Sequence, residues 1–99
     1  MVTPFVAPGS RHVFHQYTVR VLERDRLHQA LDAEGIRTAI YYPVPLHLQT
    51  CFAHLGGKPG DCPEAERTAA EVLSLPMFPE ITEEQQARVV DAIARHFRR

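Results

Sequence analysis

The chain has 99 residues, of which 44% are hydrophobic and 23% charged, as in ordinary soluble globular domains. This composition argues against disordered, collagen-like and fibrous proteins, and the length allows one modest hydrophobic core. The formal net charge is -1 with the arginines scattered among the acids, so nothing indicates a nucleic-acid-binding surface. No apolar run approaches the roughly 18 residues of a membrane-spanning helix. We therefore expect a folded, cytoplasmic domain that binds neither nucleic acid nor membrane.

The N-terminal region predicts a lead-in followed by a strand. Residues 1–11 are rich in proline and glycine, so we expect a linker before a single domain that spans residues 12–99. Apolar and polar residues alternate over residues 13–22, which predicts a half-buried strand. His15 and Tyr17 lie on the same face of this strand as its valines.

A helix and a second strand are predicted next. Apolar spacing indicates a helix over residues 24–34, with Asp25 placed to cap its start. Gly35 can adopt the left-handed conformation and end the helix in a Schellman motif. The alternation over residues 36–42 predicts a strand, and Pro43 ends it because proline lacks a backbone donor.

The middle of the chain predicts short helical pieces. Residues 46–55 have room for one or two helical turns before a glycine-rich break. Pro63 suits the first turn of the next helix, with Asp61 or Cys62 as its cap. Its predicted inner stripe consists of Ala65, Ala69, Val72 and Leu73.

The C-terminal region predicts a short strand and a final helix. Residues 73–79 are apolar and bracketed by prolines, as expected for an extended segment. Thr82 and Gln85 have the spacing of a capping box. The apolar face of the following helix is Val89, Val90, Ile93, Ala94 and Phe97. The element order predicts an α/β (α+β) two-layer sandwich, in which about three strands carry the helices on one face.

The sequence gives little support for a catalytic serine or for a zinc site. Ser10 and Ser74 are the only serines, and neither follows a nucleophile-elbow pattern. A zinc site could use His47, Cys51 and His54, which would share one helical face, with Cys62 following. The spacing matches no standard zinc motif, and a buried cysteine often acts as a small hydrophobic residue. We therefore expect no metal.

The ordered motifs HQYTVR, GIRT, YYPVPLHLQ, AE and LSLPMFP resemble the C-terminal small domain of the DegT/DnrJ/StrS-type aminotransferases. The resemblance covers residues 13–97. It implies the small-domain fold of fold-type I transferases and a family of pyridoxal-phosphate enzymes that aminate nucleotide-linked keto-sugars. It also implies that the complete enzyme is a homodimer, whose larger N-terminal domain supplies the cofactor lysine.

Lys58, the only lysine, matches no cofactor lysine in the resemblance. We therefore expect no cofactor and no transaminase activity on this chain alone, which would contribute binding contacts to the active-site cleft. A stand-alone binding or assembly module, which kept the fold without the chemistry, is the alternative. No feature of the sequence identifies the nucleotide sugar or the keto carbon that would be aminated.

The resemblance places the turn after the second predicted strand beside the nucleotide sugar. Prolines fix φ angles in this turn and reduce the entropy lost on binding. The candidate substrate-binding residues are His47, Tyr41, Tyr42, Gln49, His15 and Tyr17. Tyr42 could equally pack in the core, and a core or interdomain position is favoured for His15 and Tyr17. His47 is the preferred contact because its local pattern does not require it for packing.

Overall fold

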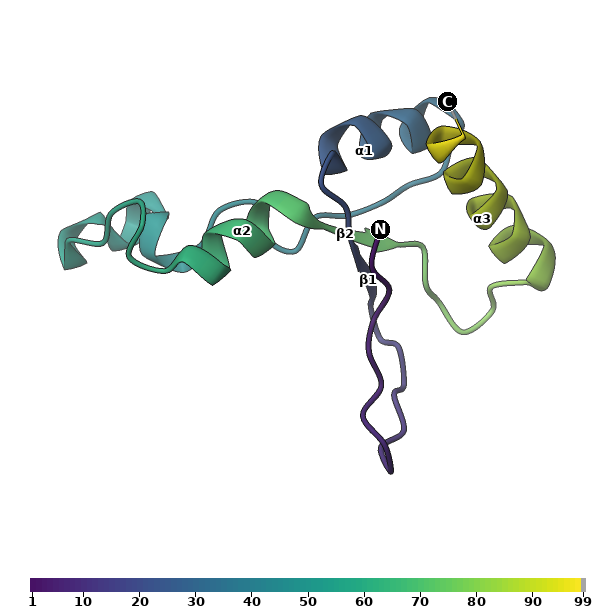
Figure 1. The fold of residues 1–99 in the computed structure, drawn as a ribbon, viewed down its shortest axis with the longest axis horizontal. Coiled ribbons are helices and arrows are strands. Elements are labelled where there is room, and N and C mark those ends of the chain that lie inside the picture. Colours follow the sequence, from purple (N-terminus) through teal and green to yellow (C-terminus); the bar gives the residue numbers. More distant parts are fainter. Residues whose placement is uncertain (99) are drawn as a thin grey trace.

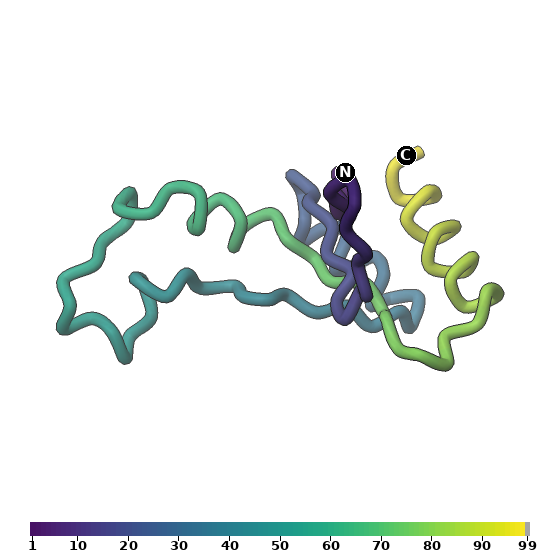
Figure 2. Tube along the Cα trace, turned by 90° about the horizontal axis from the view of Figure 1, so that it is seen from below, coloured from purple at the N-terminus to yellow at the C-terminus, as the bar shows by residue number. Residues whose placement is uncertain are grey.

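The computed structural model describes residues 1–98, with two segments that project from a small helical body (Figure 1). In chain order the elements are β1 (Tyr17–Arg20), α1 (Arg24–Ala33), the 3₁₀ helices η1 (Leu46–Leu48) and η2 (Thr50–Leu55), α2 (Pro63–Glu71), β2 (Val72–Leu75) and α3 (Glu83–Phe97). Residues 40–71, here called the arm, leave the body and return to it, as Figure 2 shows. Residues 1–16 form the other projection, the N-terminal hairpin. No helix within residues 1–98 is long and apolar enough to cross a membrane.

The sheet has two antiparallel strands, β1 and β2, with Val19 opposite Leu73. Both side chains are fully buried, and their face of the sheet packs against α1 and α3. The core consists of Val19, Val21, Leu27, Leu31, Ile36, Leu73, Ala92 and Ile93. The predicted two-layer α+β class is therefore confirmed.

The predicted strand over residues 36–42 is reduced to one bridge. Ala39 donates to the Ser74 carbonyl at 3.0 Å and accepts from the Ser74 N–H at 2.7 Å. The next hydrogen-bonded pair of an antiparallel ladder would join residue 37 to Pro76, which has no N–H to donate. The prediction of about three strands therefore overstates the sheet by one.

β1 is shorter than the predicted strand over residues 13–22. Phe14 has a φ of 48°, outside the strand region, and its N–H donates to Nδ1 of His12 at 2.8 Å. Val13 is 82% exposed. Apolar and polar residues alternate through this turn as they do in the strand, so the sequence pattern did not reveal the turn. Val2 also exchanges two backbone hydrogen bonds with Arg20, so the N-terminal hairpin returns to the edge of β1.

The end of α1 is confirmed and its predicted cap is wrong. Gly35 has a φ of 74°, and the N–H groups of Gly35 and Ile36 donate to Asp32 and Leu31 in the Schellman pattern. Glu23 occupies the cap position, and its side chain accepts no hydrogen bond from the first backbone N–H groups of the helix. Asp25 lies in the first turn instead, where it accepts from Nε of Arg24 at 2.6 Å.

The apolar face predicted for α2 includes residues that belong to the next element, β2. The helix begins at Pro63 as predicted, but it ends at Glu71, so Val72 and Leu73 belong to β2. Pairing with β1 takes these two residues out of the helix, and Ala69 is the one buried residue left on α2. Cys62 holds the cap position without a side-chain hydrogen bond.

The capping box of α3 is confirmed. Thr82 Oγ1 accepts from the Gln85 N–H at 3.1 Å, and Gln85 Oε1 accepts from the Thr82 N–H at 3.0 Å. Of the predicted apolar face, Ile93 is buried, whereas Val90 is 62% and Phe97 49% exposed. The core-facing stripe is therefore narrower than the sequence suggests.

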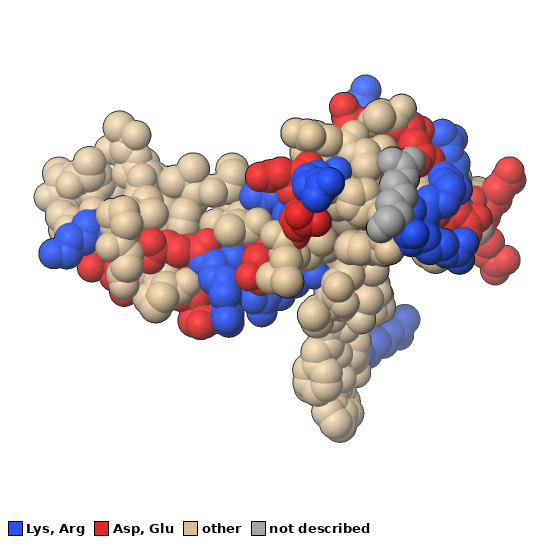
Figure 3. Space-filling model, turned by 45° about the horizontal axis from the view of Figure 1, so that its top comes forward, with Lys and Arg blue, Asp and Glu red and all other residues tan. Residues whose placement is uncertain are grey.

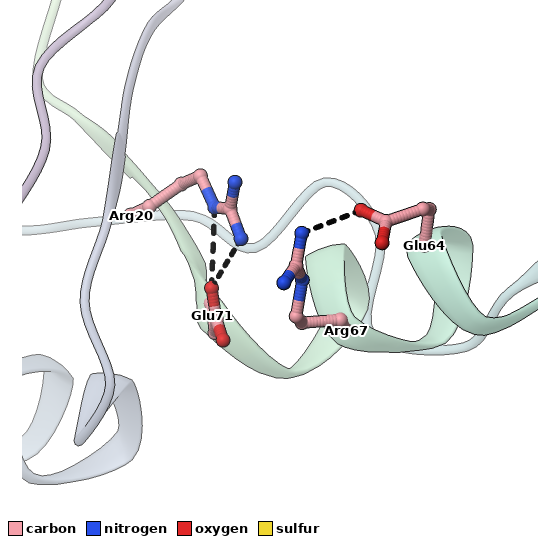
Figure 4. A network of polar contacts seen from close by, with 4 residues as sticks. All are labelled: Arg20, Glu64, Arg67 and Glu71. Atoms are coloured by element: carbon pink, nitrogen blue, oxygen red, sulfur yellow. Dashed lines mark hydrogen bonds and ion pairs between the residues drawn. The ribbon is translucent and has the colours of Figure 1, made fainter.

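Two arginines join the arm to the body. Arg24 is buried, and its Nη1 donates to the carbonyls of Ala69 at 3.0 Å and Val72 at 2.8 Å. Arg20 forms an ion pair with Glu71 at 2.6 Å, as Figure 4 shows beside the Arg67–Glu64 pair within α2. Helix C-termini leave carbonyls without helical partners, and Arg24 supplies the missing donors. The direction in which α2 leaves the body follows from these contacts.

We predict that Leu73→Ala lowers the free energy of unfolding by about 2–5 kcal/mol, because it leaves a cavity between the sheet and the helices. Urea denaturation measures the effect. Leu22→Ala is the control, since Leu22 is 89% exposed and its loss should cost less than about 0.5 kcal/mol. Equal effects of the two substitutions would contradict the core described above.

Candidate functional site

The structure distributes the six predicted site residues over several places. His15 and Tyr41 line one hollow, here called the sheet-edge hollow. Tyr42 and Gln49 line a second one, the arm hollow. His47 lines neither of these hollows. Tyr17 packs partly buried against the hydrophobic core, so it does not share the exposed environment of His15.

The sheet-edge hollow has a volume of about 230 Å³ and lies where residues 37–41 run beside the end of β2. Its lining is His15, Gln16, Arg37, Thr38, Ala39, Tyr41, Ser74, Leu75, Pro76 and Met77. The backbone bridge between Ala39 and Ser74 forms the floor of the hollow. The hydroxyl groups of Ser74 and Thr18 lie 2.8 Å apart and share a hydrogen bond. The hollow thus combines a rigid backbone with several hydrogen-bonding side chains.

Arg37 is the residue of this hollow that the sequence reasoning missed. It has no ion-pair partner within residues 1–98 and is exposed. A guanidinium group offers several donors in one plane, which suits phosphate and carboxylate oxygens. A signal was present in the sequence, since the predicted alternation put Arg37 on the same face as Tyr41.

The arm hollow has a volume of about 330 Å³ and lies between η1 and α2. Its lining is more apolar and consists of Tyr42, Val44, Pro45, Leu46, Gln49, Glu64, Ala65, Thr68 and Ala69. The Gln49 side chain is partly committed, since Nε2 donates to the Val44 carbonyl at 3.2 Å. Tyr42 is 70% exposed and therefore does not pack in the core.

His47 is held inside the arm. Its side chain is 15% exposed, and its Nε2 is buried 3.5 Å from Oε2 of Glu66 on α2. The chain returns closely over it, because a Cβ added to Gly57 would lie 2.5 Å from the His47 carbonyl oxygen. The local sequence pattern gave no sign of this long-range contact.

The described residues contain no cluster of side chains that could bind a metal ion. No three His, Cys, Asp or Glu side chains among residues 1–98 come together as a metal site. The two zinc candidates Cys51 and Cys62 are free and exposed. His47 lies in η1, whereas Cys51 and His54 lie in η2, and the extended Gln49 separates the two 3₁₀ helices, so the three side chains do not share one helical face.

Charged side chains are unevenly distributed over the surface. On the face drawn in Figure 3 they gather on the helical body and along α2, whereas the N-terminal hairpin, in which Arg11 is the one Lys, Arg, Asp or Glu, is mostly uncharged. Phe5 and Val13 in the hairpin are each 82% exposed, and Leu55 in the arm is 72% exposed. Exposed apolar groups of this kind are typical of surfaces that contact another domain or chain.

We predict that Gly57→Ala forces the arm to rearrange, because the new Cβ would overlap the His47 carbonyl oxygen. The amide resonances of residues 46–48 should shift strongly in an NMR spectrum. Gly56→Ala is the control, because Gly56 has a φ of 79° but open space around it, so strain should stay local. Unchanged residue 46–48 resonances in Gly57→Ala would contradict the close approach.

Comparisons with known proteins agree with the resemblance seen in the sequence. The chain is 57% identical over 98 residues to a "Pleiotropic regulatory protein" of Geobacillus stearothermophilus, covering 99% of this chain and 26% of that protein. It is 52% identical over 92 residues to a UDP-N-acetyl-3-dehydro-alpha-D-glucosamine 3-aminotransferase of Acidithiobacillus ferrooxidans, covering 93% of this chain and 24% of the relative. The chain thus spans about a quarter of the length of these relatives.

A solved structure agrees in fold as well. The crystal structure of Streptomyces venezuelae DesV in complex with a ketimine intermediate matches with a TM-score of 0.94 and 42% identity, over 99% of this chain and 26% of that one. The model of the DegT/DnrJ/EryC1/StrS aminotransferase family matches residues 1–94. The chain belongs to the DegT/DnrJ/EryC1/StrS aminotransferase family.

Proposed function

We propose that this chain is the C-terminal part of an aminotransferase that acts on nucleotide-linked keto-sugars, where it supplies substrate-side contacts of the active-site cleft. The printed names of several relatives support the substrate class, since they describe transaminases of UDP-linked and dTDP-linked sugars. The observation that carries the proposal is the family match over residues 1–94 together with coverage of about a quarter of each relative. The complete enzyme would add an N-terminal domain and assemble as a homodimer.

The family depends on pyridoxal phosphate, a cofactor that acts as an electron sink when it is bound to a lysine. The residues described here do not fit that group. Lys58 is the only lysine, lies exposed in a loop, and lines neither the sheet-edge hollow nor the arm hollow. The loop is closed by Asp61, which accepts from the Lys58 backbone N–H at 3.0 Å. We therefore assign no cofactor and no chemical step to this chain alone.

The sheet-edge hollow offers the chemistry that a nucleotide sugar needs. Arg37 can donate to pyrophosphate oxygens, and Tyr41 and His15 can exchange hydrogen bonds with phosphate or sugar oxygens. Pro43 and Pro45 fix two φ angles where the chain passes from this hollow to the arm hollow. The preorganised segment loses less entropy when a ligand binds.

The exposed apolar surface favours a second function, a non-catalytic binding or assembly module. Leu46 is 69% and Leu55 72% exposed, and the N-terminal hairpin adds Phe5 and Val13. In the proposed enzyme this surface would face the N-terminal domain or the other subunit. In a stand-alone module it would instead promote association of the chain with itself.

We predict that Arg37→Ala weakens binding of UDP-N-acetylglucosamine to this chain about tenfold, the loss of one charge-assisted hydrogen bond. Isothermal titration calorimetry measures the dissociation constant. The control is Arg26→Ala, which removes the same charge from α1, where Arg26 pairs with Glu23 at 2.9 Å. Equal weakening in both variants would contradict specific phosphate contact. Absence of binding together with self-association in light scattering would favour the assembly module.

A further inference from the structure

The environment of the His47 ring is unusual for a residue expected to contact a ligand. Nε2 is the one buried side-chain nitrogen or oxygen within residues 1–98 that has no hydrogen-bond partner. Its nearest acidic atom is Oε2 of Glu66, at 3.5 Å. The other ring nitrogen, Nδ1, is not buried and makes no hydrogen bond in the described part of the chain. The two nitrogens of His47 are therefore in different surroundings.

Glu66 is itself fixed in place. Its oxygens accept from the Gly60 N–H at 2.9 and 3.0 Å, and its side chain is 23% exposed. Glu66 belongs to α2, whereas Gly60 belongs to the loop that precedes this helix. The carboxylate therefore joins the loop to the helix while it faces His47 Nε2. A small movement of the ring would close the 3.5 Å separation to a hydrogen bond.

We propose that Glu66 is a positioning residue that holds neutral His47 in the Nε2–H tautomer. A carboxylate can only accept a hydrogen bond, so the nitrogen facing it must carry the proton. The hydrogen bond made by one ring nitrogen determines the protonation of the other. Nδ1 then keeps its lone pair and can accept a hydrogen bond from a hydroxyl group of a bound ligand. The ligand role rests on the proposed function, in which that hydroxyl belongs to the nucleotide sugar.

A purely structural role of Glu66 makes a different prediction. If Glu66 only anchors the Gly60 N–H, a glutamine should replace it, because the amide oxygen can accept the same hydrogen bond. Its amide NH₂ would then face His47 as a donor and favour the opposite tautomer, with the proton on Nδ1. Glu66→Gln therefore separates anchoring of the loop from control of the ring.

The test is long-range ¹⁵N–¹H NMR of the histidine rings in this chain at about pH 8, where ordinary imidazoles are neutral. The wild type should show a protonated Nε2 on His47, and Glu66→Gln should move the population towards Nδ1–H with the Gly60 amide still hydrogen-bonded. Glu80→Gln, an exposed residue outside α2, is the control and should change nothing. A wild type with the proton on Nδ1, or the same tautomer in Glu66→Gln, would overturn the proposal.

Titration with UDP-N-acetylglucosamine tests the ligand role separately. Glu66→Gln should bind about threefold to tenfold more weakly than the wild type, as expected for one hydrogen bond. Unchanged affinity despite a changed tautomer would overturn the acceptor role of Nδ1. If the wild type binds no nucleotide sugar while the tautomer responds as predicted, the proposed function fails and the positioning of His47 by Glu66 stands.

Discussion

The arrangement of the molecule depends on the buried guanidinium group of Arg24. It lies at the start of α1 and donates to the carbonyls of Ala69 and Val72, where α2 passes into β2. These carbonyls would otherwise be buried without donors, at a cost of about 1–3 kcal/mol each. The same group also bonds Asp25, whose charge partly balances its own. One side chain thus links the core helix, the central strand and the base of the arm.

Both hollows depend on this junction. β2 leaves it with Leu73 facing the core and with Ser74 paired to Ala39 on its other edge, which forms the floor of the sheet-edge hollow. α2 leaves it in the opposite direction and forms one wall of the arm hollow, and its Glu66 faces His47. The same junction therefore carries a wall residue of each hollow, Ala69 in the arm hollow and Ser74 in the sheet-edge hollow.

Some features set by neighbouring residues were predictable from the sequence, whereas features set by distant residues were not. The Schellman ending at Gly35 and the capping box at Thr82 require only local residues, and both were predicted. The missing third strand depends on Pro76 lying opposite residue 37, a register that alternation does not reveal. The surroundings of His47 depend on Gly57 and Glu66, and the role of Arg24 depends on carbonyls 45 and 48 positions away.

We propose that this chain carries a substrate-side surface, and its single lysine, Lys58, is not suited to hold the cofactor. The most direct test is to incubate the chain with pyridoxal phosphate, reduce with borohydride and measure the adduct by intact and peptide mass spectrometry, with Lys58→Arg as the matched control. We expect no stoichiometric adduct and no difference between the wild type and Lys58→Arg. A stoichiometric adduct on Lys58 that Lys58→Arg abolishes would contradict the proposal.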